Sequence, residues 1–195
     1  MCLKRITFCI LSQFLFFISV KAVVVDGFYV GNHGDTIKTR FNISTSAGQP
    51  DLFKLYSRVE MVTDSGSRKT IFKPGDIESF GFTYKEKNWT FVSKKIGEKS
   101  EFFSPEIDGK KNNLYSQLYA TGGGQLSYTA VKYFITKEDS IFLILPSADR
   151  LKKNKEKLMG FFTDVEIQKQ IQARFNEPDD IEKDVLFIVN YANGK

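Results

Sequence analysis

The chain has 195 residues, 42% of them hydrophobic and 26% charged, a composition typical of one globular domain with room for a small appendage. Its formal net charge is +5, but Lys4, Arg5 and Lys21 carry three of the positive charges and no acidic residue lies before position 23. Without residues 1–22, the 25 basic and 23 acidic residues leave +2, which does not indicate a protein that binds nucleic acid.

Residues 1–22 have the pattern of a secretory signal peptide. A basic pair precedes an apolar run over residues 6–20, and Ala22 ends a small-residue cleavage site. The alternative is an uncleaved membrane anchor, but the run is short for a spanning helix. Cleavage removes Cys2 and Cys9, the only cysteines, so we expect an exported mature protein, periplasmic or secreted, without disulfides, thiolate chemistry or a transmembrane segment.

Residues 23–146 are predicted to form an antiparallel β domain. Short runs of alternating apolar and polar residues, separated by turn residues, predict roughly eight to ten strands with no helical period among them. A polar loop is expected over 44–51. The predicted hairpins pair 27–31 with 36–43, 57–62 with 68–73, 101–107 with 113–120, and 128–136 with 140–145.

The segment 69–92 is expected to organise this domain. It contains a strand, a Pro-Gly-Asp turn at 74–76 and a second strand in which aromatic residues alternate with small ones. Phe80, Phe82 and Tyr84 therefore share one face of that strand, which we expect to be buried. Gly81, on the other face, suggests the close approach of a neighbouring backbone.

Residues 147–195 are predicted to form a helical segment of two to three helices packed on the β domain. A Lys-rich stretch over 148–162 is the least regular of the three. The sequence Thr-Asp-Val-Glu at 163–166 predicts a capping box in which the Thr163 hydroxyl caps the second helix. Pro178 is expected near the start of the third helix, followed by an apolar stripe.

Few residues point to catalysis. His33, the only histidine, lies near Asp35 and could act as a general base, but the turn residues around it favour a structural role. Asp76 and Glu78 could form a carboxylate pair, although a turn residue and a solvent-facing strand residue explain them more simply. The glycines at 122–124 lack the Lys-Ser/Thr of a phosphate loop. We therefore predict no catalytic, cofactor-binding or metal-binding residues and no cofactor.

Two groups of residues could instead bind a partner. Four lysines of the first predicted helix could meet an anionic surface, but a solvated helix face is the simpler explanation. One tryptophan and several tyrosines could form a platform for a glycan or a protein, against the simpler alternative of core packing. These residues are Lys152, Lys153, Lys155 and Lys157, and Trp89, Tyr115, Tyr119, Tyr128 and Tyr133.

Several segments resemble a loose group of exported proteins from Bacteroidetes: the hairpin from Gly27 to Ile37, the segment from Phe72 to Phe80, and the Asn190-Tyr191 ending. The last departs from the group at Ala192, where asparagine is expected. These motifs are turns and strand signals, so the resemblance implies export and transfers no functional residue. The first segments are also similar to small SH3-like or Sm-like barrels, an analogy of fold alone.

Together these patterns predict an α+β protein that is mainly antiparallel β, either a barrel-like meander or two small sheets, with a C-terminal helical segment. The absence of a nucleophile–base set favours a non-enzymatic binding or accessory module of the bacterial cell envelope, with a protein or glycan partner and no nucleic acid. The alternatives are a carboxylate-dependent hydrolase acting on an extracellular or cell-wall polymer, and a purely structural accessory.

Overall fold

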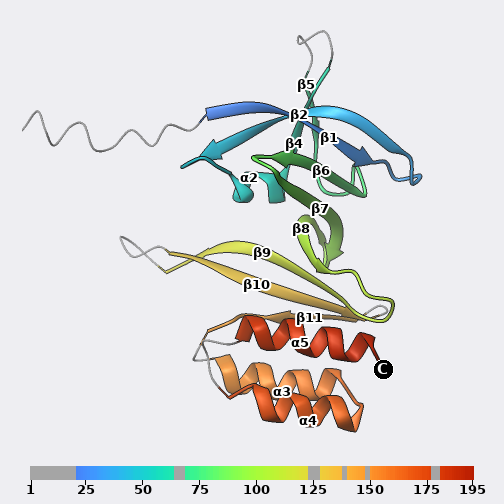
Figure 1. The fold of residues 1–195 in the computed structure, drawn as a ribbon, viewed down its shortest axis with the longest axis vertical. Helices are drawn as coiled ribbons and strands as arrows, with labels where there is room; N and C mark the ends of the chain where they lie inside the picture. Colours follow the sequence, from blue (N-terminus) through green and yellow to red (C-terminus); the bar gives the residue numbers. More distant parts are fainter. Residues whose placement is uncertain (1–20, 64–68, 123–127, 138–139, 148–149, 177–180) are drawn as a thin grey trace, which may run out of the picture.

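The computed structural model describes residues 21–63, 69–122, 128–137, 140–147, 150–176 and 181–195. In these residues, eleven strands and one short helix are followed by three longer helices (Figure 1). The strands are β1 (Lys21–Val30), β2 (Thr36–Ser46), β3 (Gln49–Pro50), β4 (Val59–Val62), β5 (Lys69–Phe72), β6 (Ser79–Tyr84), β7 (Lys87–Ile96), β8 (Lys99–Ile107), β9 (Asn113–Thr121), β10 (Tyr128–Lys137) and β11 (Ser140–Ile144). The helices are α2 (Leu52–Ser57), α3 (Leu151–Phe161), α4 (Val165–Arg174) and α5 (Ile181–Asn193).

The strands form one antiparallel sheet in the order β11-β10-β9-β8-β7-β6-β1-β2-β4-β5, with β3 paired to β2. Strands β6 to β11 follow one another as a meander, and β1 joins β6 to the N-terminal strands. The described strands do not close into a barrel, and they form one bent sheet rather than two separate ones (Figure 1). The predicted α+β class with a C-terminal helical segment is confirmed.

The aromatic face of β6 is buried, as its alternation predicts. Phe80 is fully buried and Phe82 is 3% exposed. Close approach by neighbours explains Gly81: a Cβ there would lie 2.8 Å from the ring of Phe28, and a Cβ on Gly27 would lie 2.3 Å from the Gly81 carbonyl oxygen. Gly27 and Gly81 lie diagonally across the β1–β6 pair, opposite Phe82 and Phe28, and allow the two strands to approach closely there.

The short helix α2 was not predicted from the sequence. The predicted loop 44–51 is wrong as well, because β2 extends to Ser46 and β3 follows after a two-residue turn. Asp51 begins the helix by accepting a hydrogen bond from the Lys54 backbone N–H at 3.3 Å, and Leu55 and Tyr56 are buried. Six residues are too few to show a helical period, so only the capping residue could have indicated the helix.

The helical segment forms as predicted, with one correction. Asp164, and not Thr163, caps α4: its Oδ1 accepts from the N–H groups of Glu166 and Ile167 at 2.9 and 3.1 Å. The backbone of Asp164 is extended, so the helix begins one residue later than the predicted capping box requires. Pro178, expected near the start of α5, lies outside the described residues.

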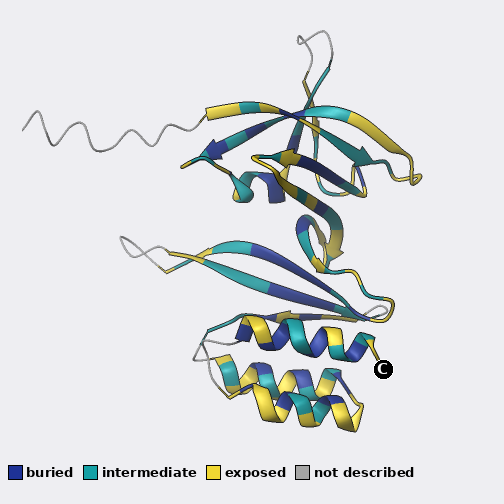
Figure 2. Cartoon of the chain, in the orientation of Figure 1, coloured by how far each residue is buried: buried dark blue, intermediate teal, exposed yellow. Residues whose placement is uncertain are grey.

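Two large hydrophobic cores lie at the two ends of the bent sheet (Figure 2). The aromatic core joins β1, β2, β4, β6, β7 and β8 with α2. The helical core joins β9, β10 and β11 with the three C-terminal helices, so these helices share their core with the last three strands. A small third cluster, formed by Phe103, Tyr115 and Phe134, packs at the bend between the two.

Most of the predicted signal peptide, residues 1–20, lies outside the described residues. Lys21 and Ala22 are described, and they begin β1 by pairing with Thr45 and Ser44 of β2. The hydroxyl of Thr45 also donates to the Lys21 carbonyl oxygen at 3.1 Å. Cleavage after Ala22 would shorten β1 by this end pair and leave the pairing from Val23 onward.

Candidate functional site

Two clefts flank α2 at the bend of the sheet. Tyr56 of α2 and Leu118 of β9 line both clefts and form the wall between them. We name them after one residue of each: the Lys132 cleft, with a volume of about 650 Å³, and the Trp89 cleft, with a volume of about 540 Å³. Volumes of this size suit a small ligand or a short polymer segment.

The alternation of β10 distributes side chains between the two clefts. Val131 and Tyr133 line the Trp89 cleft, whereas Lys132 between them lines the other. Because successive side chains of a strand point to opposite faces, neighbouring residues serve different sites. The short helix α2 fills the space between the sheet halves and prevents the two clefts from merging.

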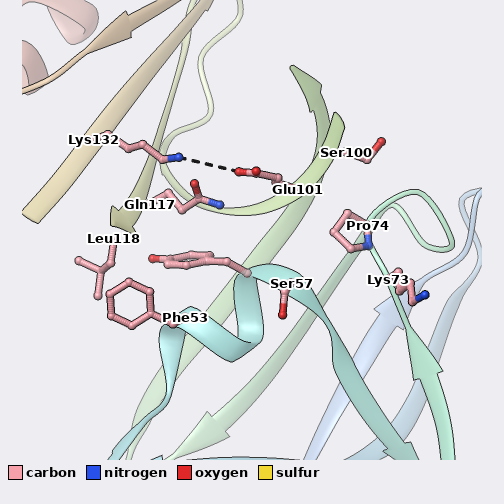
Figure 3. A pocket seen from close by; sticks show the side chains of 10 residues that line it. Phe53, Ser57, Lys73, Pro74, Ser100, Glu101, Gln117, Leu118 and Lys132 are labelled. Carbon is pink, nitrogen blue, oxygen red and sulfur yellow. Dashed lines mark ion pairs between the residues drawn. The ribbon is translucent and has the colours of Figure 1, made fainter. Parts of the chain in front are cut away.

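The Lys132 cleft is closed at one side by an ion pair, which Figure 3 shows. Lys132 Nζ lies 3.9 Å from Glu101 Oε2, so the two charges largely satisfy each other. The buried Gln117 side chain donates to the Phe102 carbonyl oxygen at 3.1 Å. Phe53, 45% exposed, stands at the rim. The polar groups of this cleft are therefore mostly engaged within the protein.

The Trp89 cleft collects ionisable side chains from several elements. Glu106 of β8 accepts a hydrogen bond from the Ser116 hydroxyl at 2.5 Å, and Glu182 comes from the first turn of α5. Both belong to exposed residues, so the carboxylates are open to solvent. Lys87 brings a positive charge to the same cleft.

Two tyrosine hydroxyls lie at the floor of the cleft. Burial raises the pKa of the Tyr133 hydroxyl, and the nearby carboxylates of Glu182, its hydrogen-bond acceptor, and Glu106 raise it further. Burial also raises the pKa of Tyr56, partly offset by hydrogen bonds with Ser104 and the Leu118 backbone. Both hydroxyls therefore remain protonated at neutral pH, and the Tyr133 hydroxyl donates its hydrogen bond to Glu182.

Trp89 forms an aromatic wall of the cleft. The ammonium group of Lys87 stands 4.1 Å from the centre of the indole ring, within the range of a cation–π interaction. The indole Nε1 is buried, with no hydrogen-bond partner among the described residues. An unpaired buried donor costs about 1–3 kcal/mol, and such groups call for an explanation in a folded protein.

The residues weighed for catalysis do not meet in either cleft. His33 and Asp35 are exposed in the turn between β1 and β2. Asp76 and Glu78 are exposed as well, and Asp76 accepts from the Lys73 backbone N–H at 2.8 Å, which stabilises the turn. Of the three glycines, Gly122 follows β9, and Gly123 and Gly124 lie outside the described residues. No group of three or more His, Cys, Asp or Glu among the described residues could hold a metal ion.

The predicted binding platforms are divided by the fold. Tyr133 and Trp89 line one cleft, while Tyr115 is buried in the small cluster at the bend and Tyr128 is 64% exposed at the start of β10. Tyr119 is half-buried on β9. Three lysines of α3 are exposed: Lys152, Lys153 and Lys157. The fourth, Lys155, donates to the Gln172 carbonyl oxygen and to the Asn176 side chain, at 2.9 Å each.

Six charged residues line the clefts and were not predicted from the sequence as site residues: Lys73, Lys87, Glu101, Glu106, Lys132 and Glu182. Each is a polar residue at an ordinary solvent-facing position of a strand, helix or turn, so its sequence context carries no signal. Only the bend of the sheet brings these elements together.

No helix in the described part of the chain is both long and apolar enough to cross a membrane. Comparison of the chain with protein-family models, with curated proteins and with solved structures finds no match.

Proposed function

We propose that the protein is an exported, non-enzymatic binding module of the bacterial cell envelope, and that it binds a glycan in the Trp89 cleft. The observation that carries this proposal is the composition of that cleft. An indole wall, two buried tyrosine hydroxyls, and exposed amide, hydroxyl and carboxylate groups converge on one cavity. Aromatic faces and hydrogen-bonding groups together match the apolar faces and hydroxyl groups of a sugar ring.

The geometry favours binding over hydrolysis. A glycoside hydrolase needs one carboxyl group that stays protonated near neutral pH, which requires an apolar, water-excluding environment. Glu106 and Glu182 belong to exposed residues, and a hydroxyl group already donates to each of them. The cleft does not provide such an environment for either carboxylate, and both can accept hydrogen bonds from a ligand.

The carboxylate-dependent hydrolase is the second candidate, and one observation favours it. Glu106 and Glu182 come from β8 and α5 into one cleft, where both act on the Tyr133 hydroxyl. A hydrolase would release reducing ends from a polysaccharide, and Glu106→Gln and Glu182→Gln would each abolish that release. A binding module would release none.

Binding is tested by titrating the purified protein with oligosaccharides prepared from cell-wall polymers, while following the fluorescence of Trp89, the only tryptophan. A sugar that packs on the indole should change the intensity or wavelength of the emission. Trp89→Phe, followed by calorimetry, should weaken binding by about tenfold, because the larger ring face of the indole is lost. Phe53→Ala at the rim of the other cleft is the matched control and should bind normally.

Export is tested separately. The protein recovered from the periplasm or the medium should begin near Val23 when its N-terminus is sequenced, as the cleavage pattern at Ala22 predicts. Recovery of a soluble protein that still begins at Met1 would contradict the proposed export.

A further inference from the structure

We infer that the Trp89 cleft selects a glycan carrying a free ammonium group, such as a non-acetylated amino sugar, over its acetylated counterpart. This inference rests on the proposed function and adds the chemistry by which the ligand is chosen.

The charges that line the cleft favour a cation. Glu106 and Glu182 are the two carboxylates among its described lining residues, and Lys87 is the one ammonium group. Ser116 donates one hydrogen bond to Glu106, and Tyr133 donates one to Glu182. An ionised carboxylate has about four acceptor positions, so each retains capacity for a ligand N–H group.

The indole ring already holds a cation. Lys87 Nζ stands 4.1 Å from the centre of the Trp89 ring, which shows that this face attracts positive charge. Lys87 is exposed, so its side chain can swing into solvent when a ligand enters. Lys87 therefore competes with a cationic ligand for the face of Trp89, and removing the lysine should strengthen the binding of that ligand.

The side chains that line the cleft favour a sugar. Its walls come from β7, β8, β9 and β10 and present Asn88, Thr90 and Ser104, whose amide and hydroxyl groups suit sugar hydroxyls. Strand β7 pairs with β8 only from Val92 onward, so the part of β7 that lines the cleft is hydrogen-bonded to β6 alone. A cationic peptide that adds to this strand edge is the alternative ligand, and the test below includes one.

The test compares two oligosaccharides of equal length, one of glucosamine and one of N-acetylglucosamine, by calorimetry at about pH 6, where amines are protonated. The glucosamine form should bind at least about tenfold more tightly, and added salt should reduce the difference because charges in a solvent-open cleft are screened. Glu106→Gln and Glu182→Gln should each weaken its binding by about tenfold while leaving the acetylated form unchanged.

Two further variants make the result specific. Lys87→Ala should bind glucosamine oligomers more tightly than the parent protein does, an effect that loss of structure would not produce. Glu98→Gln makes the same charge change in the exposed turn between β7 and β8, outside the cleft, and should leave both affinities unchanged.

The possible failures can be told apart. Equal affinity for the two oligosaccharides, with both weakened by Trp89→Phe, would overturn selection by charge and leave glycan binding in place. Binding of neither, in a protein that does bind a trilysine peptide, would overturn both the inference and the proposed glycan function. Unchanged or weaker binding in Lys87→Ala would contradict the role assigned to this lysine, and with it the cation site on Trp89.

Discussion

In the aromatic core, Phe80 contacts the rings of Phe41, Phe91 and Phe102, whereas the helical core is built mainly from isoleucine, leucine and valine. The difference follows from what each half of the sheet packs against. The N-terminal strands are covered by α2, which has only six residues, so large rings from the strands themselves must fill the space. The C-terminal strands are covered by helices, whose four-residue spacing brings branched aliphatic side chains onto the sheet.

The division of the sheet between two separate cores also explains where the clefts lie. Each half buries its own core, and the small cluster of Phe103, Tyr115 and Phe134 fills only part of the bend. The remaining space on either side of α2 is open and lined by polar residues. The candidate site therefore lies where two well-packed regions meet without a common core.

The largest loss of stability is expected from a substitution in the aromatic core. Phe80→Ala removes a fully buried ring that stacks on Phe91 at a centroid distance of 4.8 Å, and the cavity should lower the free energy of unfolding by about 3–5 kcal/mol. Phe82→Ala should act in the same way. Urea denaturation measures the change, and Ser79→Ala on the same strand should cost far less. An unchanged unfolding midpoint for Phe80→Ala would mean that this face is not a core.

A similar substitution in the helical core tests whether the two halves unfold together. Ile188→Ala on α5 removes a fully buried side chain and should cost about 2–4 kcal/mol. Because the hydrogen-bonded sheet runs through both halves, we expect a single transition. Trp89 fluorescence reports on the N-terminal half, and circular dichroism at 222 nm reports mainly on the C-terminal helices. Two separate midpoints would show that the halves are independent units.

A smaller loss of stability is expected from a substitution at the start of α4. Asp164→Ala removes the side-chain acceptor of two backbone N–H groups and should lower the free energy of unfolding by about 1 kcal/mol. Thr163→Ala should change it by less than about 0.5 kcal/mol, since Thr163 does not cap this helix. The reverse order of the two effects would restore the capping box predicted from the sequence.

The smallest loss of stability is expected from a substitution of Glu60 in the N-terminal half. Asn42 donates a hydrogen bond to this carboxylate at 2.9 Å, and this bond, with Lys54 and Lys69 nearby, lowers the pKa of Glu60 below its usual 4.5. A lowered pKa stabilises the folded state above the unfolded value, and the contribution is lost as the pH falls through the folded value.

Glu60→Gln should therefore destabilise the protein by less than about 1 kcal/mol at pH 7, and by a smaller amount at about pH 3. Urea denaturation of the parent and the variant at both pH values measures the difference. A cost that stays the same at both pH values would assign the effect to packing rather than to charge.

The sequence by itself determined the strands, the C-terminal helices and the buried face of β6, because these depend on local periodicity and turn chemistry. Phe80 and Phe82 alternate with small residues, and a period of two fixes which face they share. The sequence did not reveal α2 or the cap of α4, because a six-residue helix shows no period and because Thr163 and Asp164 are both good capping residues.

Only the tertiary structure decided which residues meet in the candidate site. Glu106, Tyr133 and Glu182 are far apart along the chain, and each occupies a position that is ordinary for its own strand or helix. The bend of the sheet and the docking of α5 bring them into one cleft with Trp89. Local patterns record the face on which a side chain lies, but they do not record which distant face will lie opposite. For this reason the sequence could predict the fold class and not the site.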